Sequence, residues 1–95
     1  MTITDIKIRK LFTNPESRLK ALISVTIDDC LAIHDIKVVS GDNRLFVAMP
    51  SRKDENGVFR DIVHPIGAET RESMEDQILD AYERYLATSE TSDLY

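Results

Sequence analysis

The 95 residues, 42% of them hydrophobic and 31% charged, have the size and composition of one globular domain, which excludes a fully disordered chain. No apolar run approaches the roughly 18 residues that a membrane helix needs. The single cysteine, Cys30, excludes an internal disulfide framework and an all-cysteine metal site. The net charge of −5 argues against nucleic-acid binding, because polyanions are bound mainly through Lys and Arg.

The charge is divided unevenly along the chain. Residues 1–60 hold ten Lys and Arg against eight Asp and Glu, a balance of +2, whereas residues 61–95 hold two against nine, a balance of −7. A basic surface on the first part is therefore compatible with an acidic part that faces away from it. The alternating residues 1–10 are unlike a signal or transit peptide. Together with the single cysteine, this favours a cytoplasmic location.

The first two-thirds of the chain is predicted to form strands. Ile6 and Ile8 alternate with polar residues, which is the two-residue period of a half-buried strand. After the turn chemistry around Pro15, strict alternation from residue 19 to residue 27 marks the clearest strand. Its apolar members are Leu19, Ala21, Ile23, Val25 and Ile27.

The register of the next strand, residues 30–39, depends on the turn before it. A two-residue turn at Asp28 and Asp29 leaves Leu31 and Ile33 on the face opposite the core. A three-residue turn with a bulge near His34 buries Leu31 and Ile33 instead. We expect the two-residue turn, because it needs no bulge. The expected core face is then Cys30, Ala32, His34, Ile36 and Val38.

An apolar patch follows from that register. Leu22, Leu31 and Ile33 fall together on the face opposite the core. Exposed patches of this kind usually mark an interface, and a symmetric dimer is the commonest use of one. These three residues are the predicted dimer interface.

The second half of the chain contains a hairpin and a helix. Residues 45–49 are apolar on both faces and are expected to be covered on both sides. Residues 54–57, Asp-Glu-Asn-Gly, predict a hairpin tip with residues 58–63 as the returning strand. From about Glu69 to Leu86 the period becomes helical, with Gly67 or Thr70 as the cap. The predicted apolar stripe comprises Met74, Ile78, Ala81, Tyr82 and Tyr85.

These elements predict one α+β domain over residues 1–87 and a flexible acidic tail over residues 88–95. The domain is expected to contain a mostly antiparallel sheet of about five strands, followed by one amphipathic helix. A chain this short has little interior, so we expect it to self-associate as a dimer.

No catalytic residue, metal site or cofactor is predicted. Cys30 and His34 are four residues apart in a strand, roughly 13 Å, so they do not form a thiolate–imidazole pair. The glycines Gly41, Gly57 and Gly67 are isolated turn residues, which excludes a glycine-rich phosphate loop. An enzyme such as a small hydrolase is therefore only a third interpretation.

Basic residues flank the predicted hairpin tip. Arg52, Lys53 and Arg60 lie on a projection whose size suits a nucleic-acid groove or backbone. A charged edge that discourages sheet aggregation is the simpler interpretation, and spacing alone favours it. Lys7 and Arg9 lie opposite the core positions of the first strand. No aromatic residues interleave with these charges, so a base-stacking platform is not indicated.

A longer motif runs through the same region. Residues 46–53, Phe-Val-Ala-Met-Pro-Ser-Arg-Lys, are followed by Gly57, by Phe59-Arg60-Asp61-Ile62 and by His64-Pro65-Ile66. This sequence resembles the SpoVG family of small bacterial proteins. Residues 33–38, Ile-His-Asp-Ile-Lys-Val, and the helix opening Thr70-Arg71 also match, so the resemblance covers roughly residues 3 to 86.

The resemblance implies a dimeric α+β regulator of septation, sporulation and gene expression that binds DNA, with RNA as a second ligand. It implies phosphate contacts by Arg52, Lys53 and Arg60. Lys7, Arg9 and Arg71 are expected to extend this basic track. The tip departs from the Thr-Pro-Asp-Gly type expected in familiar members, and its added acids, Asp54 and Glu55, are expected to weaken phosphate attraction.

A second function stays open at this point. The net charge and the acidic helix favour a protein-interaction module that influences septum placement without binding nucleic acid, through division or regulatory proteins. Salt separates the two hypotheses, because phosphate binding weakens steeply as salt rises and an apolar interface does not.

Overall fold

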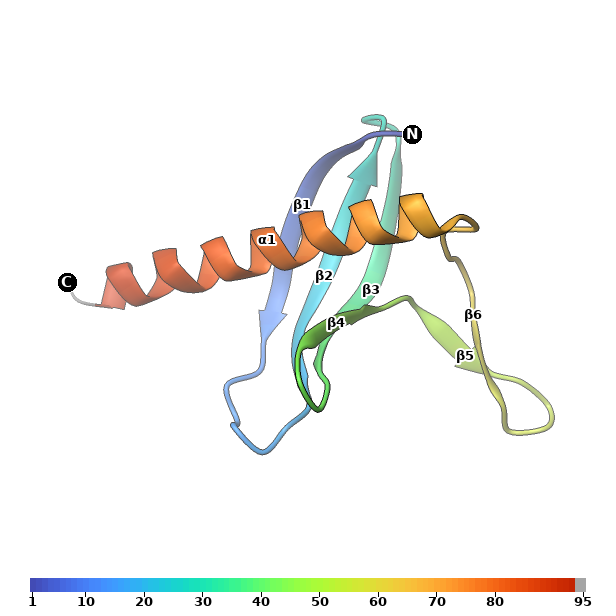
Figure 1. Cartoon of the computed structure of the whole chain (residues 1–95), viewed down its shortest axis with the longest axis horizontal. Helices are drawn as coiled ribbons and strands as arrows, with labels where there is room; N and C mark the ends of the chain where they lie inside the picture. The colour runs from blue at the N-terminus through green and yellow to red at the C-terminus, as the bar shows by residue number, and fades with distance from the viewer. Residues whose placement is uncertain (94–95) are drawn as a thin grey trace.

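The computed structural model describes the backbone of residues 1–93 and the side chains of residues 1–88. Four strands form an antiparallel sheet in chain order, and two short strands form a separate sheet. Figure 1 shows one long helix lying across the larger sheet, which confirms the predicted α+β class. The elements are β1 (Ile3–Leu11), β2 (Leu19–Ile27), β3 (Leu31–Ser40), β4 (Leu45–Ala48), β5 (Ser51–Lys53), β6 (Phe59–Asp61) and α1 (Ala68–Asp93).

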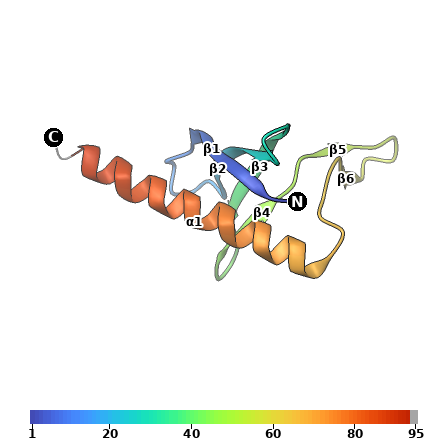
Figure 2. The ribbon, with the colours of Figure 1, turned by 90° about the horizontal axis from the view of Figure 1, so that it is seen from above.

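The core lies between the four-stranded sheet and α1. The alternation predicted for β2 is confirmed, since every second residue from Ala21 to Ile27 is buried. Ile36 and Val38 of β3 pair beside them and are fully buried. Figure 2 shows α1 on one side of the sheet only. The opposite side, which we call the outer face, is not covered by a helix of residues 1–93.

The helix begins at Ala68, and the carbonyl of Gly67 accepts the Arg71 amide at 3.0 Å, as expected of the cap residue. Its buried stripe follows a spacing of four residues through Met74, Ile78 and Tyr82. Tyr85, predicted to be in the stripe, is 43% exposed. The half-buried residues that pack against the core beside this stripe are Leu79 and Leu86.

The helix also continues past the predicted end at Leu86 to Asp93. The predicted flexible tail begins at residue 88, so most of its side chains lie outside the described residues, and its flexibility stays a prediction.

The prediction of a two-residue turn between β2 and β3 is wrong. The three-residue turn and the bulge of the alternative are confirmed, but its burial of Leu31 is not, because Leu31 is 57% exposed. Ile27 pairs with Leu31, so three residues, 28–30, form the turn. Asp28 and Asp29 both have positive φ, 53° and 56°. Asp tolerates this conformation better than most residues.

A bulge in β3 then restores the expected core positions. Ile33 pairs with Val25, but Ile36 pairs with Ile23, and Asp35 has a φ of 64° at the shift. The residues that face the helix are therefore odd-numbered before the bulge and even-numbered after it. For this reason Ile36 and Val38 are buried as predicted, whereas the expected core residues Cys30, Ala32 and His34 are exposed.

The same register separates the predicted interface residues. Ile33 packs against the core, whereas Leu31, the first residue of β3, is 57% exposed. Leu22 pairs with Lys37 on the outer face. The three residues therefore do not form one patch, and their part in a dimer stays a prediction.

The prediction that β4 is covered on both sides is wrong. Phe46 is exposed because α1 covers only the other side of the sheet.

Candidate nucleic-acid interface

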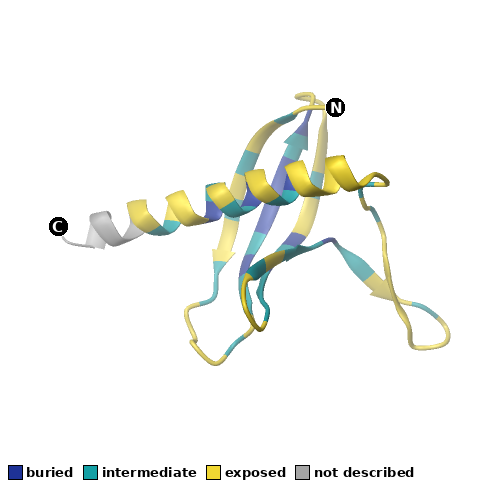
Figure 3. Cartoon of the chain, viewed as in Figure 1, coloured by how far each residue is buried: buried dark blue, intermediate teal, exposed yellow. Residues whose placement is uncertain are grey.

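The small sheet forms an arm that extends away from the body of the domain. We define the arm as residues 51–61, which comprise β5, β6 and the tip between them. Figure 1 shows the arm extending beyond the end of β4, and Figure 3 shows it without a buried residue. The predicted returning strand corresponds to β6, which pairs with β5 and forms no part of the larger sheet.

The register of the arm sorts its basic residues between two faces. Arg52 pairs with Arg60, and Lys53 pairs with Phe59. Directly opposite residues share a face and neighbours alternate. Arg52 and Arg60 consequently lie on one face, and Lys53 lies on the other, with its Nζ 5.7 Å from the Phe59 ring centroid. The structure brings together two of the three predicted phosphate contacts and separates the third.

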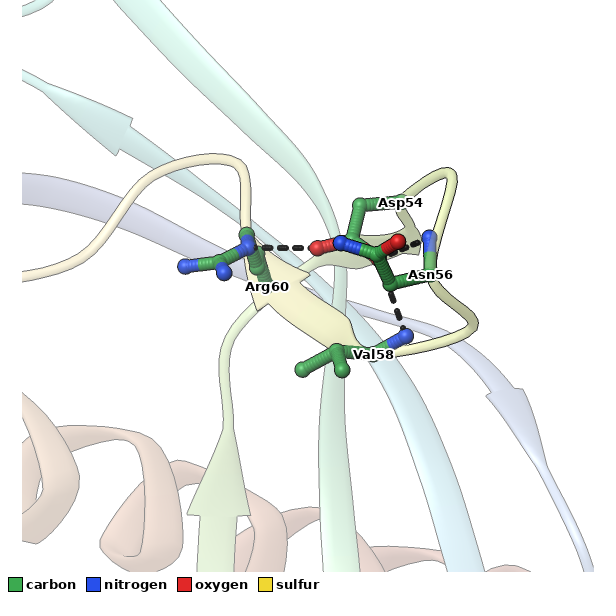
Figure 4. A network of polar contacts seen from close by, with 4 residues as sticks. All are labelled: Asp54, Asn56, Val58 and Arg60. Carbon is green, nitrogen blue, oxygen red and sulfur yellow. Dashed lines mark hydrogen bonds and ion pairs between the residues drawn. The ribbon is translucent and has the colours of Figure 1, made fainter.

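Asp54 organises the tip of the arm (Figure 4). Its Oδ1 accepts the amides of Asn56 at 2.9 Å and Val58 at 3.0 Å. Its Oδ2 accepts Arg60 Nε at 2.7 Å. The Arg60 guanidinium, with the two amides, lowers the pKa of the Asp54 carboxyl below its ordinary value of 3.8.

This geometry gives the acidic tip a structural role. Two arginines opposite one another repel, and the Asp54 carboxylate paired with Arg60 offsets part of that repulsion. Asp54 holds Arg60 through Nε alone, and the Arg60 side chain is 71% exposed. The terminal amino groups of Arg60 therefore remain available to a phosphate beside Arg52. This orientation of Arg60 partly offsets the loss of phosphate attraction expected from the acids at the tip.

The outer face carries a second set of cations. Lys7 pairs with Ser24, while Lys10 and Lys37 both pair with Leu22. Ser24 and Leu22 alternate with core residues of β2, so these partners point away from α1. Arg9, two residues after Lys7, lies on the same side by alternation, and its Nε donates to Ser24 Oγ. The bulge between Ile8 and Lys10 brings Lys10 to this side as well. The outer-face cations are Lys7, Arg9, Lys10 and Lys37, and the acids near them are Asp5 and Asp35.

The acidic part of the chain lies on the other side of the molecule. α1 carries most of the acids of residues 61–95 and covers the face opposite the outer face (Figure 2). Arg71 lies on this helix, beside Val47, Met49 and Pro65. The structure therefore does not bring Arg71 together with the outer-face cations. The exposed acids of α1 include Glu69, Glu72, Asp76, Asp80 and Glu83.

One polar contact on the outer face was missed by sequence reasoning. Ser24 is only 6% exposed, and its Oγ shares a 2.8 Å hydrogen bond with His34 Nδ1. The distance matches a nucleophile–base pair, but the oxygen also accepts from Arg9 and is covered from solvent. A substrate does not reach it in this arrangement. The available signal was a small polar residue, Ser24, between the apolar Ile23 and Val25.

The described residues offer little other chemistry. No group of three His, Cys, Asp or Glu side chains there is arranged to hold a metal ion. Cys30 is exposed in the turn before β3, and His34 is bound to Ser24. Within residues 1–93 no helix is both long and apolar enough to cross a membrane.

Comparison with known proteins identifies the family of this chain. The SpoVG family model matches residues 1–84. A relative from Caldicellulosiruptor bescii is 49% identical over 90 residues, which cover 95% of this chain and all of the relative. A relative from Clostridium perfringens is 52% identical over 88% of this chain and 91% of its own length. Both carry the name "Putative septation protein SpoVG". The chain belongs to the SpoVG family.

Proposed function

We propose that this protein is a cytoplasmic regulator that binds DNA, with RNA as a second ligand, through the outer face and the arm. In this proposal it acts on septation and sporulation through gene expression. The single observation that supports binding is the separation of charge between the two sides of the molecule. Four cations lie on the outer face and two arginines share one face of the arm. Most acids of the last third lie on α1.

The net charge of −5 does not prevent this binding. A nucleic acid on the outer face is separated from the exposed acids of α1 by the sheet and by a helix about 10 Å across. The Debye length at physiological ionic strength is about 8 Å. The local cations therefore dominate the potential that the phosphates meet.

The link to septation comes from the relatives, whose names call them septation proteins. Phosphate contacts position a protein on a nucleic acid without reading its sequence. Selection of a particular target sequence therefore requires additional contacts to the bases. We assign the phosphate contacts to Arg52, Arg60, Lys7 and Arg9. Lys53 and Arg71 are weaker candidates, because each lies apart from these groups.

A homodimer is part of this proposal. An isolated two-stranded hairpin is marginally stable in water, and the arm exposes Phe59 by 69% and Val58 by 50%. Ile62, which follows β6, is 64% exposed. A second copy that covers these side chains stabilises the arm and repeats the basic surface across a two-fold axis.

The same apolar side chains favour the alternative function. A protein-interaction module acting on the septum would use Phe59, Ile62 and Ile66, the last of which is 96% exposed. Such an interface is nearly insensitive to salt, because it contains few charge pairs.

Fluorescence anisotropy tests the proposal with labelled duplex DNA and single-stranded RNA at two salt concentrations. The proposal predicts binding that weakens as salt rises. It also predicts that the Arg52→Ala/Arg60→Ala double variant has a salt slope smaller by about two. Absence of binding at low salt, or a slope that the double variant leaves unchanged, contradicts the proposal and favours the protein-interaction module.

A further inference from the structure

Three strands contribute one polar residue each to a single point on the outer face. Arg9 comes from β1, Ser24 from β2 and His34 from β3. Arg9 Nε donates to Ser24 Oγ at 3.1 Å, and His34 Nδ1 shares the 2.8 Å hydrogen bond with the same oxygen. Ser24 is thus a bridge between two side chains that are themselves exposed.

The arrangement depends on one irregularity of the sheet. Arg9 reaches the outer face by alternation with Lys7, whereas His34 reaches it because the β3 bulge separates His34 from Ile36. Asp35 takes its φ of 64° in this bulge. Bulges re-aim side chains and are over-represented beside functional sites. Without the β3 bulge, His34 would lie on the core face with Ile36.

The bridge leaves specific donors unused. A guanidinium has five N–H donors, and Arg9 uses Nε in its contact with Ser24. His34 is held through Nδ1, which leaves Nε2. Among the described residues, the amino groups of Arg9 and the Nε2 of His34 have no hydrogen-bond partner. Lys7, which pairs with Ser24 itself, adds a positive charge next to them.

We propose that Arg9, His34 and Lys7 form a binding site for one phosphate group of a nucleic-acid backbone, with Ser24 as its positioning residue. This inference rests on the proposed function for the source of the phosphate. Arg9 and His34 donate hydrogen bonds to the phosphate oxygens and Lys7 supplies charge. Ser24 touches no ligand and fixes the two donors at one spacing. The acids nearest the site by register are Asp5 and Asp35.

Four variants test the site by anisotropy with a labelled single-stranded RNA and a duplex DNA. Arg9→Ala is expected to lower the salt slope by about one. Ser24→Ala is expected to weaken binding by about threefold with the slope unchanged, because every charge remains. His34→Gln, an exposed change, is expected to weaken binding without loss of folding. Thr26→Ala is the matched control, two residues along β2 on the same face, and is expected to bind like the wild type.

Equal affinities for Ser24→Ala and Thr26→Ala, with His34→Gln also unchanged, overturn the site. If Ser24→Ala fails to fold, the result for His34→Gln decides alone.

A second measurement separates this inference from the proposed function. NMR resonances of the His34 ring and Arg9 Nε are followed while inorganic phosphate is added to the wild type and to His34→Gln. A saturable shift of both groups in the wild type, with the Arg9 shift weakened in the variant, supports the site even if no nucleic acid binds. Absence of a saturable shift, in a protein that binds nucleic acid, overturns the site and leaves the proposed function standing. Absence of both responses overturns both.

Discussion

The body of the domain and the arm differ in the interactions that stabilise them. The body buries the core residues of β2, β3 and α1, several of them completely. The arm has no buried residue, and it is held by its own strand pairing and by Asp54. Stability therefore resides in the body. The arm is free to present its basic face, because nothing in the core depends on it.

The largest expected effect tests where the stability lies. Ile78 is fully buried between α1 and the sheet, so Ile78→Ala is expected to lower the free energy of unfolding by about 2–5 kcal/mol. Phe59→Ala in the arm is expected to change it by less than about 0.5 kcal/mol at low protein concentration. Urea denaturation measures both. A comparable loss from Phe59→Ala shows that the arm is packed, and a dependence of that loss on protein concentration assigns the packing to a second copy.

The next effect distinguishes the two faces of the arm. Arg52→Ala and Lys53→Ala remove the same charge from adjacent positions, but Arg52 lies beside Arg60 and Lys53 lies beside Phe59. We expect Arg52→Ala to weaken nucleic-acid binding by about fivefold to tenfold near 0.1 M salt. Lys53→Ala is expected to weaken it by less than about twofold. Equal losses in a binding titration mean that net charge, and not the face, determines binding.

A smaller effect is confined to the tip. Gly57 has a φ of 81°, and an added Cβ meets only Lys53 Cε, at 3.8 Å. The cost of Gly57→Ala is therefore backbone strain of about 1 kcal/mol. Amide hydrogen exchange is expected to speed up at Val58 and to stay unchanged in β2. Faster exchange in β2 contradicts the independence of the arm from the body.

The smallest effect is a pH dependence of the tip. The folded pKa of Asp54 is lowered, mainly by Arg60, so its contribution is present above the ordinary value of 3.8 and is lost as pH falls through the lower folded pKa. The amide shifts of Asn56 and Val58 are expected to titrate together below 3.8. Asp54→Asn removes the inflection. A midpoint above the ordinary value shows that the ion pair with Arg60 does not form in solution.

Much of the body is predictable from the sequence. The alternation in β2 and the four-residue spacing of Met74, Ile78 and Tyr82 in α1 both arise because one face of the element is buried. Burial of one face is what a periodic pattern of apolar residues predicts. The hairpin at residues 54–57 is predictable because glycine with positive φ is a local requirement.

The register of β3 is not predictable in the same way. The bulge at Asp35 shows no local signal and is favoured because it buries Ile33 as well as Ile36. The contact between Ser24 and His34 depends on that bulge, so it was missed together with the register. Separation of the arm from the sheet is also a tertiary property, since periodicity does not tell which strand a returning strand joins.

One pair of variants tests most directly whether the side of the molecule, and not its net charge, governs binding. Lys7→Gln on the outer face and Gln77→Glu on the exposed surface of α1 each make the net charge more negative by one. The measurement is the affinity for duplex DNA and single-stranded RNA near 0.1 M salt. We predict a loss of about fivefold to tenfold for Lys7→Gln and less than about twofold for Gln77→Glu. Equal losses, or a larger loss for Gln77→Glu, contradict a nucleic-acid interface on the outer face.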